Sequence, residues 1–439
     1  MEEPPFPGGH MEDTRFGIIL LETKFVGKED IDRCLQLQFL GGQAKPLGQI
    51  MLEEGLIHEN VLKLVLDVQE RRRARLEEER ILGETKDGRL PTLQELLQRS
   101  RVLGVTDLIL GAGRPPFVRL GGRLSKLFAT PLDQEWMDSF LQTVLCEEER
   151  KEFETKGFVF SVLELEAGIW VRIRILHDSN GISAVLRLFP SPFPSLTELG
   201  YGQWLLDQLD KSGLFLITGG AGSGKTTTLA SMVQFLAKQA GLHIQVLSST
   251  GEFRLQGERS LVTTKHFDEK EGGLAEGLRA ALRSDADILV LDELRGNDAV
   301  ELAIQAAEMG KLVLAAVRGC GTVKTLRSLV YGFEPMGRAP VRKSLASILL
   351  GVVHQELVPT RDHKGLILTR EELKIEADTR AALEKGDFED LVLLLNLGNQ
   401  EYGTSLDENL MDLVEEDRIE VDEAISRAMD CQRMLKAVR

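Results

Sequence analysis

The chain of 439 residues is too long for one ordinary domain, and its 43% hydrophobic and 28% charged residues are typical of globular proteins. Its formal net charge of −16 gives no bulk attraction for polyanions, so a phosphate-bearing ligand needs a local site and nucleic acid is not expected as a partner. The four cysteines are far apart and form no CxxC pair, which argues against a zinc knuckle or a disulfide framework.

The first ten residues, MEEPPFPGGH, contain neither the basic nor the apolar segment of a secretory signal. No apolar run in the sequence approaches the ~20 residues that cross a bilayer as a helix. We therefore expect a cytoplasmic protein that reaches a membrane only through its partners.

An internal repeat opens the chain, because residues 15–38 match residues 46–69 under a shift of 31 positions. Each copy is predicted to form a short helix, a turn and a longer helix, and two such copies can bury their apolar faces against each other. The matching pairs are Gly17 and Gly48, Leu21 and Leu52, Glu22 and Glu53, Val26 and Ile57, Leu35 and Leu66, and Gln38 and Gln69.

After a charged stretch and a region of mixed helix and strand, the proline-rich segment 190–195 marks a boundary. Beyond it the sequence alternates strands and helices, which predicts a parallel sheet with helices on both faces. The predicted strands are 214–218, 243–247, 288–291 and 312–317.

The strongest motif is GGAGSGKT, which fits GxxxxGK[ST], follows an apolar strand and opens a helix. Glycines allow the backbone N–H groups to turn toward phosphate oxygens, and the helix N-terminus adds partial positive charge. Lys225 is predicted to reach the β- and γ-phosphates and the Thr226 hydroxyl to bind Mg²⁺. The alternative is a glycine loop without a ligand. The predicted phosphate-binding residues are Gly219, Gly220, Ala221, Gly222, Ser223, Gly224, Lys225, Thr226 and Thr227.

A second element is the apolar run 288–291, which leads into Asp292 and Glu293. This pattern predicts a buried strand that ends at the nucleotide. Asp292 would belong to the metal shell, and Glu293 would orient or deprotonate the attacking water. An ordinary strand end with two solvated acids is the alternative.

The segment 281–300, ALRSDADILVLDELRGNDAV, resembles the Walker B region of the PilT family, the hexameric retraction ATPases of the type II/IV secretion ATPase superfamily. Four further blocks resemble the same family in order and spacing. They are TDLILGAGRPPFVRLGGRL (106–124), SLTELGY (195–201), AIQAAEMGKLVLAAV (303–317) and GTSLDENLMDLVEEDRIEVDEAI (403–425).

The resemblance implies an α/β fold with a RecA-like P-loop core, a PAS-like α+β domain before it and a small helical N-terminal domain. The expected domains are a helical repeat domain at 1–75, a charged linker helix at 76–94, the PAS-like domain at 95–194, the RecA-like ATPase domain at 195–370 and a helical C-terminal region at 371–439.

The branch of the superfamily is indicated by two features. The chain lacks the zinc-binding cysteines of the assembly and secretion ATPases, and DTRAALEKGD (378–387) loosely resembles a helix that marks retraction motors. The N-terminal repeat is similar to the MshEN-type domain, whose repeats begin RLG and help to bind cyclic di-GMP. Here Lys24 replaces a glycine of that pattern and Pro46 replaces an arginine, so a purely structural role is the alternative to cyclic di-GMP binding.

Two departures from the family concern its chemistry. The acidic run after the second strand is replaced by residues 248–252, of which only Glu252 keeps a carboxylate, and Arg318 takes the place of a histidine. The resemblance implies that Glu252 and Glu293 are catalytic. Arg318, a permanent cation where the family has a neutral donor, is expected to stabilise charge on the γ-phosphate instead. The sequence thus favours nucleotide binding more strongly than fast hydrolysis.

Three strand arginines match family arginines that reach the nucleotide of a neighbouring subunit: Arg172, Arg174 and Arg187. An arginine supplied across an interface makes hydrolysis depend on assembly. Exposed arginines on an edge of a sheet are the alternative.

These patterns predict a ring-forming motor ATPase, a homohexamer, that uses ATP and Mg²⁺ to drive an inner-membrane pilus platform protein and is therefore peripheral at the inner membrane. The altered acidic and histidine positions favour a second hypothesis, a weakly hydrolysing regulatory paralogue that co-assembles with a competent motor ATPase. A third is a signalling adaptor whose repeat domain senses cyclic di-GMP.

Overall fold

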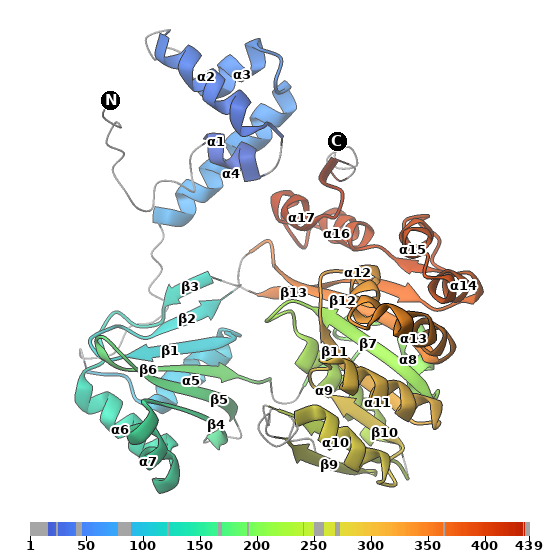
Figure 1. The fold of residues 1–439 in the computed structure, drawn as a ribbon. Coiled ribbons are helices and arrows are strands. Elements are labelled where there is room, and N and C mark those ends of the chain that lie inside the picture. The colour runs from blue at the N-terminus through green and yellow to red at the C-terminus, as the bar shows by residue number, and fades with distance from the viewer. Residues whose placement is uncertain are drawn as a thin grey trace. The chain divides into compact units, whose positions relative to one another are not determined.

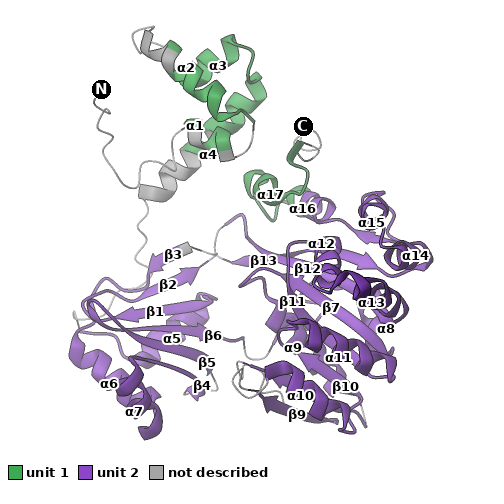
Figure 2. Ribbon diagram, in the orientation of Figure 1, with its two compact units in different colours: residues 1–82, 413–439 green, residues 83–412 purple. Residues whose placement is uncertain are grey.

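The computed structural model describes residues 16–22, 25–40, 46–77, 89–120, 123–165, 169–190, 193–239, 241–249, 259–267, 273–362, 365–432 and 434. The chain divides into two compact units, one formed by residues 1–82 with 413–439 and the other by residues 83–412 (Figures 1 and 2). Among the helices of the described ranges, none combines the length and the apolar character needed to cross a membrane.

The N-terminal repeat forms four helices in two matching pairs, as predicted. These are α1 (Phe16–Glu22), α2 (Lys28–Leu40), α3 (Leu47–Glu53) and α4 (Glu59–Glu77). The first residues of α3 and α4 lie 31 positions after those of α1 and α2, which is the shift of the sequence repeat. The helices share one buried apolar core.

The two copies pack onto each other reciprocally at the matched glycines. A Cβ added to Gly48 would lie 2.5 Å from a Leu62 methyl carbon, and one added to Gly17 would lie 3.3 Å from Ile31. Each glycine also contacts the other copy. The close neighbours are Ile31 and Leu47 for Gly17, and Leu62 and Phe16 for Gly48. A shift of 31 residues interchanges the two sets, so the copies are related by an approximate two-fold arrangement.

The second unit begins with an antiparallel six-stranded sheet of order β3-β2-β1-β6-β5-β4. In β5, alternate side chains from Val171 to Ile175 are buried, whereas Arg174 and Leu176 are exposed. One face of the sheet is therefore apolar and covered, and the other is open. The elements are α5 (Leu93–Val102), β1 (Asp107–Gly111), β2 (Phe117–Leu120), β3 (Arg123–Lys126), α6 (Gln134–Val144), α7 (Glu147–Lys156), β4 (Phe158–Leu165), β5 (Ile169–Asp178) and β6 (Gly181–Leu188).

An eight-stranded sheet comes next in the chain, with the order β14-β13-β12-β7-β11-β10-β8-β9. Its strands from β12 through β9 in this order run parallel. The strands are β7 (Gly213–Gly219), β8 (His243–Ser248), β9 (Leu261–His266), β10 (Ile288–Leu291), β11 (Leu312–Arg318), β12 (Leu349–Pro359), β13 (Leu366–Lys374) and β14 (Gly403–Thr404).

Helices cover both faces of this sheet, as predicted, because its central strands are apolar throughout. In β7, Leu214 and Leu216 belong to one core cluster, and Phe215 and Ile217 belong to the other. The helices between the strands are α8 (Gln203–Leu209), α9 (Lys225–Ala237), α10 (Gly273–Leu282), α11 (Asn297–Glu308), α12 (Thr322–Tyr331) and α13 (Pro335–Ile348).

The C-terminal part differs from the sequence prediction. Strand β13 crosses residue 370, where a boundary was expected, and pairs antiparallel with β12 and β14. Alternating side chains of β13 are buried, so this segment completes the sheet core. The region after it, expected to be helical, also contains β14. Its helices are α14 (Ala377–Lys385), α15 (Phe388–Leu395), α16 (Leu406–Glu415) and α17 (Val421–Arg427).

Candidate functional site

The glycine-rich loop connects the carboxyl end of β7 to the first turn of α9, where the sequence predicted it. Gly219 has φ of 155° and Gly224 has φ of 88°, in the left-handed region that favours glycine. A Cβ at Gly219 would also lie 2.5 Å from the Gln355 carbonyl oxygen. The backbone of this loop is therefore free to approach a ligand, and its N–H groups lie at a helix N-terminus suited to anions.

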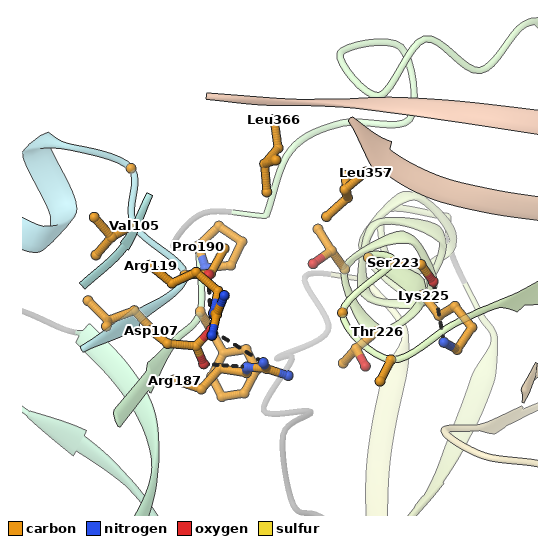
Figure 3. Close-up of a pocket in the computed structure, with 18 of the residues that line it drawn as sticks. Val105, Asp107, Arg119, Arg187, Pro190, Ser223, Lys225, Thr226, Leu357 and Leu366 are labelled. Atoms are coloured by element: carbon orange, nitrogen blue, oxygen red, sulfur yellow. Dashed lines mark hydrogen bonds and ion pairs between the residues drawn. The ribbon is translucent and has the colours of Figure 1, made fainter. Parts of the chain in front are cut away.

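Lys225 turns its amine onto this loop (Figure 3). Its Nζ donates to the carbonyl oxygens of Gly219 at 2.9 Å and Gly220 at 2.5 Å, and to the Ser223 hydroxyl at 3.3 Å. Burial, helped by the nearby Arg318 guanidinium, lowers the pKa of Lys225 to about 8, although the Glu293 carboxylate acts in the opposite direction. The amine is thus held in the loop where an anionic partner would restore its full charge.

Asp292 directly follows β10 and lies next to the carboxyl end of β8, because Leu291 pairs with Leu247 in the sheet. Its Oδ2 accepts hydrogen bonds from the Ser248 hydroxyl at 2.7 Å and from the Ser249 backbone N–H at 2.9 Å. The serines that replace the family's acidic residues therefore orient the Asp292 carboxylate. The remaining acid of that run, Glu252, lies outside the described residues.

Glu293 forms a two-pronged ion pair with Arg318, at 2.7 Å between Nε and Oε1 and 3.1 Å between a terminal guanidinium nitrogen and Oε2. Arg318 reaches this position because it ends β11 opposite Gly219 of the loop. Its side chain is 71% exposed, and exposed pairs of this kind contribute only about 0–1 kcal/mol. Arg318 can therefore exchange Glu293 for another anion at a small cost in free energy.

A cavity of about 890 Å³ adjoins the loop (Figure 3). The loop and the first turn of α9, residues 221–227, line one side of it. The other side is formed by the six-stranded sheet and the residues next to it, including Arg119, Arg187 and the apolar Val105, whereas Leu357 of β12 lies on the same side as the loop. The volume lies within the range of ligand pockets, and the lining combines cationic groups with apolar surface.

Charged residues form a row across the six-stranded sheet beside this cavity. Asp107 pairs directly with Arg119 on one side and Arg187 on the other, and Arg187 pairs with Arg172. Directly opposed residues share a face of the sheet. The Arg187 Nε donates to the buried Asp107 carboxylate at 2.9 Å. The row therefore presents three arginines around one carboxylate.

The three arginines proposed from the sequence thus occupy different surroundings. Arg187 lines the cavity of its own chain, and so does Arg119, which the sequence did not indicate as a site residue. Arg172 lies in the row but is not among the described residues that line the cavity. Arg174 is exposed and lies over the ring of Phe160, 5.5 Å from its centroid. The resemblance placed the three arginines on strands, but it did not show which of them lie near the loop.

Two buried residues that the sequence did not indicate as site residues, Gln355 and Tyr201, support the loop through hydrogen bonds. Gln355 on β12 donates from Nε2 to the Ser223 carbonyl oxygen at 2.7 Å, and it accepts from the Tyr201 hydroxyl at 3.2 Å. Gln355 stands between His354 and Glu356 in the sequence, so no isolated polar residue in an apolar run marked it, and nothing linked it to residue 201.

Comparisons with known proteins identify the family of the chain. The family described as "Type II/IV secretion system protein" matches residues 159–384. The type IV pilus retractation ATPase PilT of Pseudomonas aeruginosa is 32% identical over 267 residues, which cover 61% of this chain and 78% of that protein. The twitching motility protein of Neisseria gonorrhoeae is 27% identical over 321 residues, covering 73% of this chain and 86% of that protein.

Solved structures show the same fold. The crystal structure of the pilus retraction motor PilT with bound ADP superposes with a TM-score of 0.68 at 27% identity, covering 79% of this chain and 100% of that one. The Legionella pneumophila ATPase DotB has a TM-score of 0.70 at 20% identity, covering 78% and 98%. With the match of the family model over half of the sequence, the chain belongs to the type II/IV secretion system protein family as a PilT-like ATPase.

Proposed function

We propose that this chain hydrolyses ATP as a subunit of a hexameric motor of the retraction type in a type IV pilus. The observation that carries the proposal is the convergence of Lys225, Glu293 and Arg318 at the carboxyl ends of three neighbouring strands, beside a nucleotide-sized cavity. Its relatives named as pilus retraction and twitching motility proteins support the cellular role.

ATP would place its phosphates on the loop from Gly219 to Thr227, with its base against the apolar lining of the cavity. Thr226 and Asp292 fit Mg²⁺, since a hydroxyl and a carboxylate are the hard oxygen donors that this ion prefers. When bound, Mg²⁺ would neutralise negative charge on the β- and γ-phosphates. Arg187, with Arg119, would contact phosphates from the opposite side of the cavity.

Glu293 would orient the attacking water and accept its proton. In the structure this carboxylate is paired with Arg318. A γ-phosphate offers Arg318 a second anion, so its arrival would release Glu293 for the water and place the guanidinium on the transferring group. Glu252 remains a predicted further carboxylate of the site.

Nucleotide binding at pH 8.5 is expected to take up about three quarters of a proton per site, because Lys225 with a pKa near 8 is largely neutral at that pH and a phosphate partner recharges it. The phosphates of ADP are already ionised there. Calorimetric titration with ADP in two buffers of different ionisation enthalpy measures this uptake. Lys225→Arg is the control, since a guanidinium stays charged; the same uptake by this variant would assign the proton to another group.

The open face of the six-stranded sheet supports ring assembly. On the edge strand β4, Phe158 and Phe160 are 46% and 61% exposed, and Leu176 pairs opposite Phe158. Exposed apolar clusters on a strand edge are typical of interaction surfaces. Arg172 and Arg174 share this face, so a neighbouring subunit that covered it would bring its own nucleotide toward them. This keeps both arginines as candidates for action across the interface.

The expected partner of the ring is an inner-membrane pilus platform protein, which would hold the motor at that membrane from the cytoplasmic side. The regulatory-paralogue hypothesis is less well supported, because Asp292 and Glu293 keep organised partners despite the altered residues around them. Cyclic di-GMP binding stays a prediction, and Lys24, one of the two departures from the MshEN pattern, lies outside the described residues.

The test is to measure ATP turnover per chain against oligomer mass over a range of protein concentrations. We expect turnover to rise as the hexamer forms, and Phe160→Asp to prevent assembly and lower turnover at least about tenfold, since a buried unpaired carboxylate is costly. Leu393→Asp on α15, at a side chain that is 65% exposed, is the matched control and should assemble normally. Turnover by the monomer equal to that of the oligomer would contradict the proposal.

A further inference from the structure

Gln355 contacts the phosphate-binding loop through both its backbone and its side chain. Strand β12 pairs with β7 up to His354 opposite Thr218, so the next residue, Gln355, lies under the start of the loop. Its carbonyl oxygen occupies the space that a Cβ of Gly219 would need, and its Nε2 donates to the Ser223 carbonyl oxygen at 2.7 Å. The side chain is completely buried, so water does not compete for this hydrogen bond.

This hydrogen bond fixes a peptide group in the loop. In a trans peptide the carbonyl of Ser223 and the N–H of Gly224 point in opposite directions. Gly224, with φ of 88°, lacks the Cβ that would restrict rotation of this peptide. Because Gln355 holds the Ser223 carbonyl on the side of the sheet, it directs the Gly224 N–H away from the sheet and toward the phosphate side of the loop.

Tyr201 fixes the orientation of Gln355 in turn. Its hydroxyl donates to Gln355 Oε1 at 3.2 Å, which leaves the Gln355 amide nitrogen to face the loop. Burial raises the pKa of Tyr201, so the hydroxyl retains its proton as a donor. The Arg370 guanidinium lies over the Tyr201 ring, 5.0 Å from its centroid. The tyrosine is therefore held from its ring face as well as at its hydroxyl.

Tyr201 is also the last residue of the segment 193–201, which connects the six-stranded sheet to the ATPase core. This segment is bound to the core at both of its ends. Gln234 on α9 donates to the Phe193 carbonyl oxygen at 3.4 Å, and Arg370 donates to the Gly200 carbonyl oxygen. A displacement of the segment would therefore pull on Tyr201 and, through Gln355, on the loop.

We infer that Tyr201 and Gln355 are positioning residues that couple this connecting segment to the phosphate-binding loop. The inference rests on the proposed function, since it assigns their effect to nucleotide binding at that loop. In this arrangement a movement between the two domains of the motor changes the orientation of one loop amide and thereby the affinity for phosphates. The coupling runs within one chain, independently of contacts from a neighbouring subunit.

The experiment is a double-mutant cycle on the full chain with Tyr201→Phe, Gln355→Leu and both together. ADP affinity and the kcat and KM for ATP are measured for each. Loss of one hydrogen bond of this kind predicts about a tenfold weaker affinity for Gln355→Leu and about threefold for Tyr201→Phe. In the Gln355→Leu background, Tyr201→Phe should have no further effect, because its action passes through the missing amide.

Tyr331→Phe, at an exposed tyrosine on α12, is the matched control and should bind ADP like the unchanged protein. Thermal unfolding without nucleotide separates loop positioning from global destabilisation, and Tyr201→Phe provides the answer if Gln355→Leu does not fold. Effects that add independently, or ADP affinity unchanged in Tyr201→Phe, would overturn the inference. Absence of ADP binding by the unchanged protein would instead refute the proposed function.

Discussion

Lys225→Ala is expected to weaken ADP and ATP binding by about 100-fold and to reduce ATP turnover to background. The lysine is the cation inside the glycine loop, held by the Gly219 and Gly220 carbonyls, and charge-assisted hydrogen bonds from such a group are among the stronger ones. Losing one such hydrogen bond weakens the binding free energy by about 1.5–3 kcal/mol. The loss of positioning at the γ-phosphate further lowers the rate of hydrolysis. Nucleotide titration and steady-state phosphate release measure the two quantities.

Lys238→Ala is the matched control, because this residue ends the same helix α9 far from the loop and is exposed. It removes an equal charge from the chain and should leave both quantities unchanged. Normal turnover by a correctly assembled Lys225→Ala protein would show that the glycine loop does not hold the nucleotide.

Glu293→Gln is expected to reduce kcat by about 10²–10⁴-fold while ADP affinity stays close to that of the unchanged protein. The amide keeps the shape of the side chain but cannot accept a proton from the attacking water, and general-base catalysis contributes a factor of this size. The substitution also ends the ion pair with Arg318, whose guanidinium then depends on the γ-phosphate for an anionic partner. ATP should therefore bind at least as tightly as before.

Single-turnover kinetics with excess protein separate the bond-breaking step from binding and product release. Glu308→Gln, an exposed position at the end of α11, serves as the control and should hydrolyse ATP at the normal rate. A Glu293→Gln protein with unchanged kcat would remove the carboxylate from the mechanism. A large loss of ADP affinity would instead indicate that the pair with Arg318 shapes the loop.

The local parts of the site could be read from the sequence. The glycine loop and the strand that ends at Asp292 are continuous motifs, in which an apolar run defines the strand and the glycines or acids next to it define the functional end of that strand. The structure has β7 and β10 at these positions. The two-helix repeat could also be predicted from the sequence, because the same spacing of apolar residues occurs twice in the chain.

Contacts between distant segments could not be read in this way. Gln355 and Tyr201 share a hydrogen bond although 154 residues separate them, and the block SLTELGY that contains Tyr201 gave no indication of this partner. The Arg318 substitution was visible, but its pairing with Glu293 depends on the register of β11 against β7 and β10. The antiparallel addition of β13 and β14 was missed because β14 has only two residues and charged residues interrupt the apolar pattern of β13.

The reciprocal contacts of the N-terminal repeat bear on how this unit can change in length. Gly48 packs against Phe16 of the first copy, and Gly17 packs against Leu47 of the second. Deleting one helix pair would therefore expose the apolar face of the other pair to water. The repeat can thus be removed or added only with both of its copies together. A chain that kept a single copy would be prone to pair it with the same copy of another molecule by domain swapping.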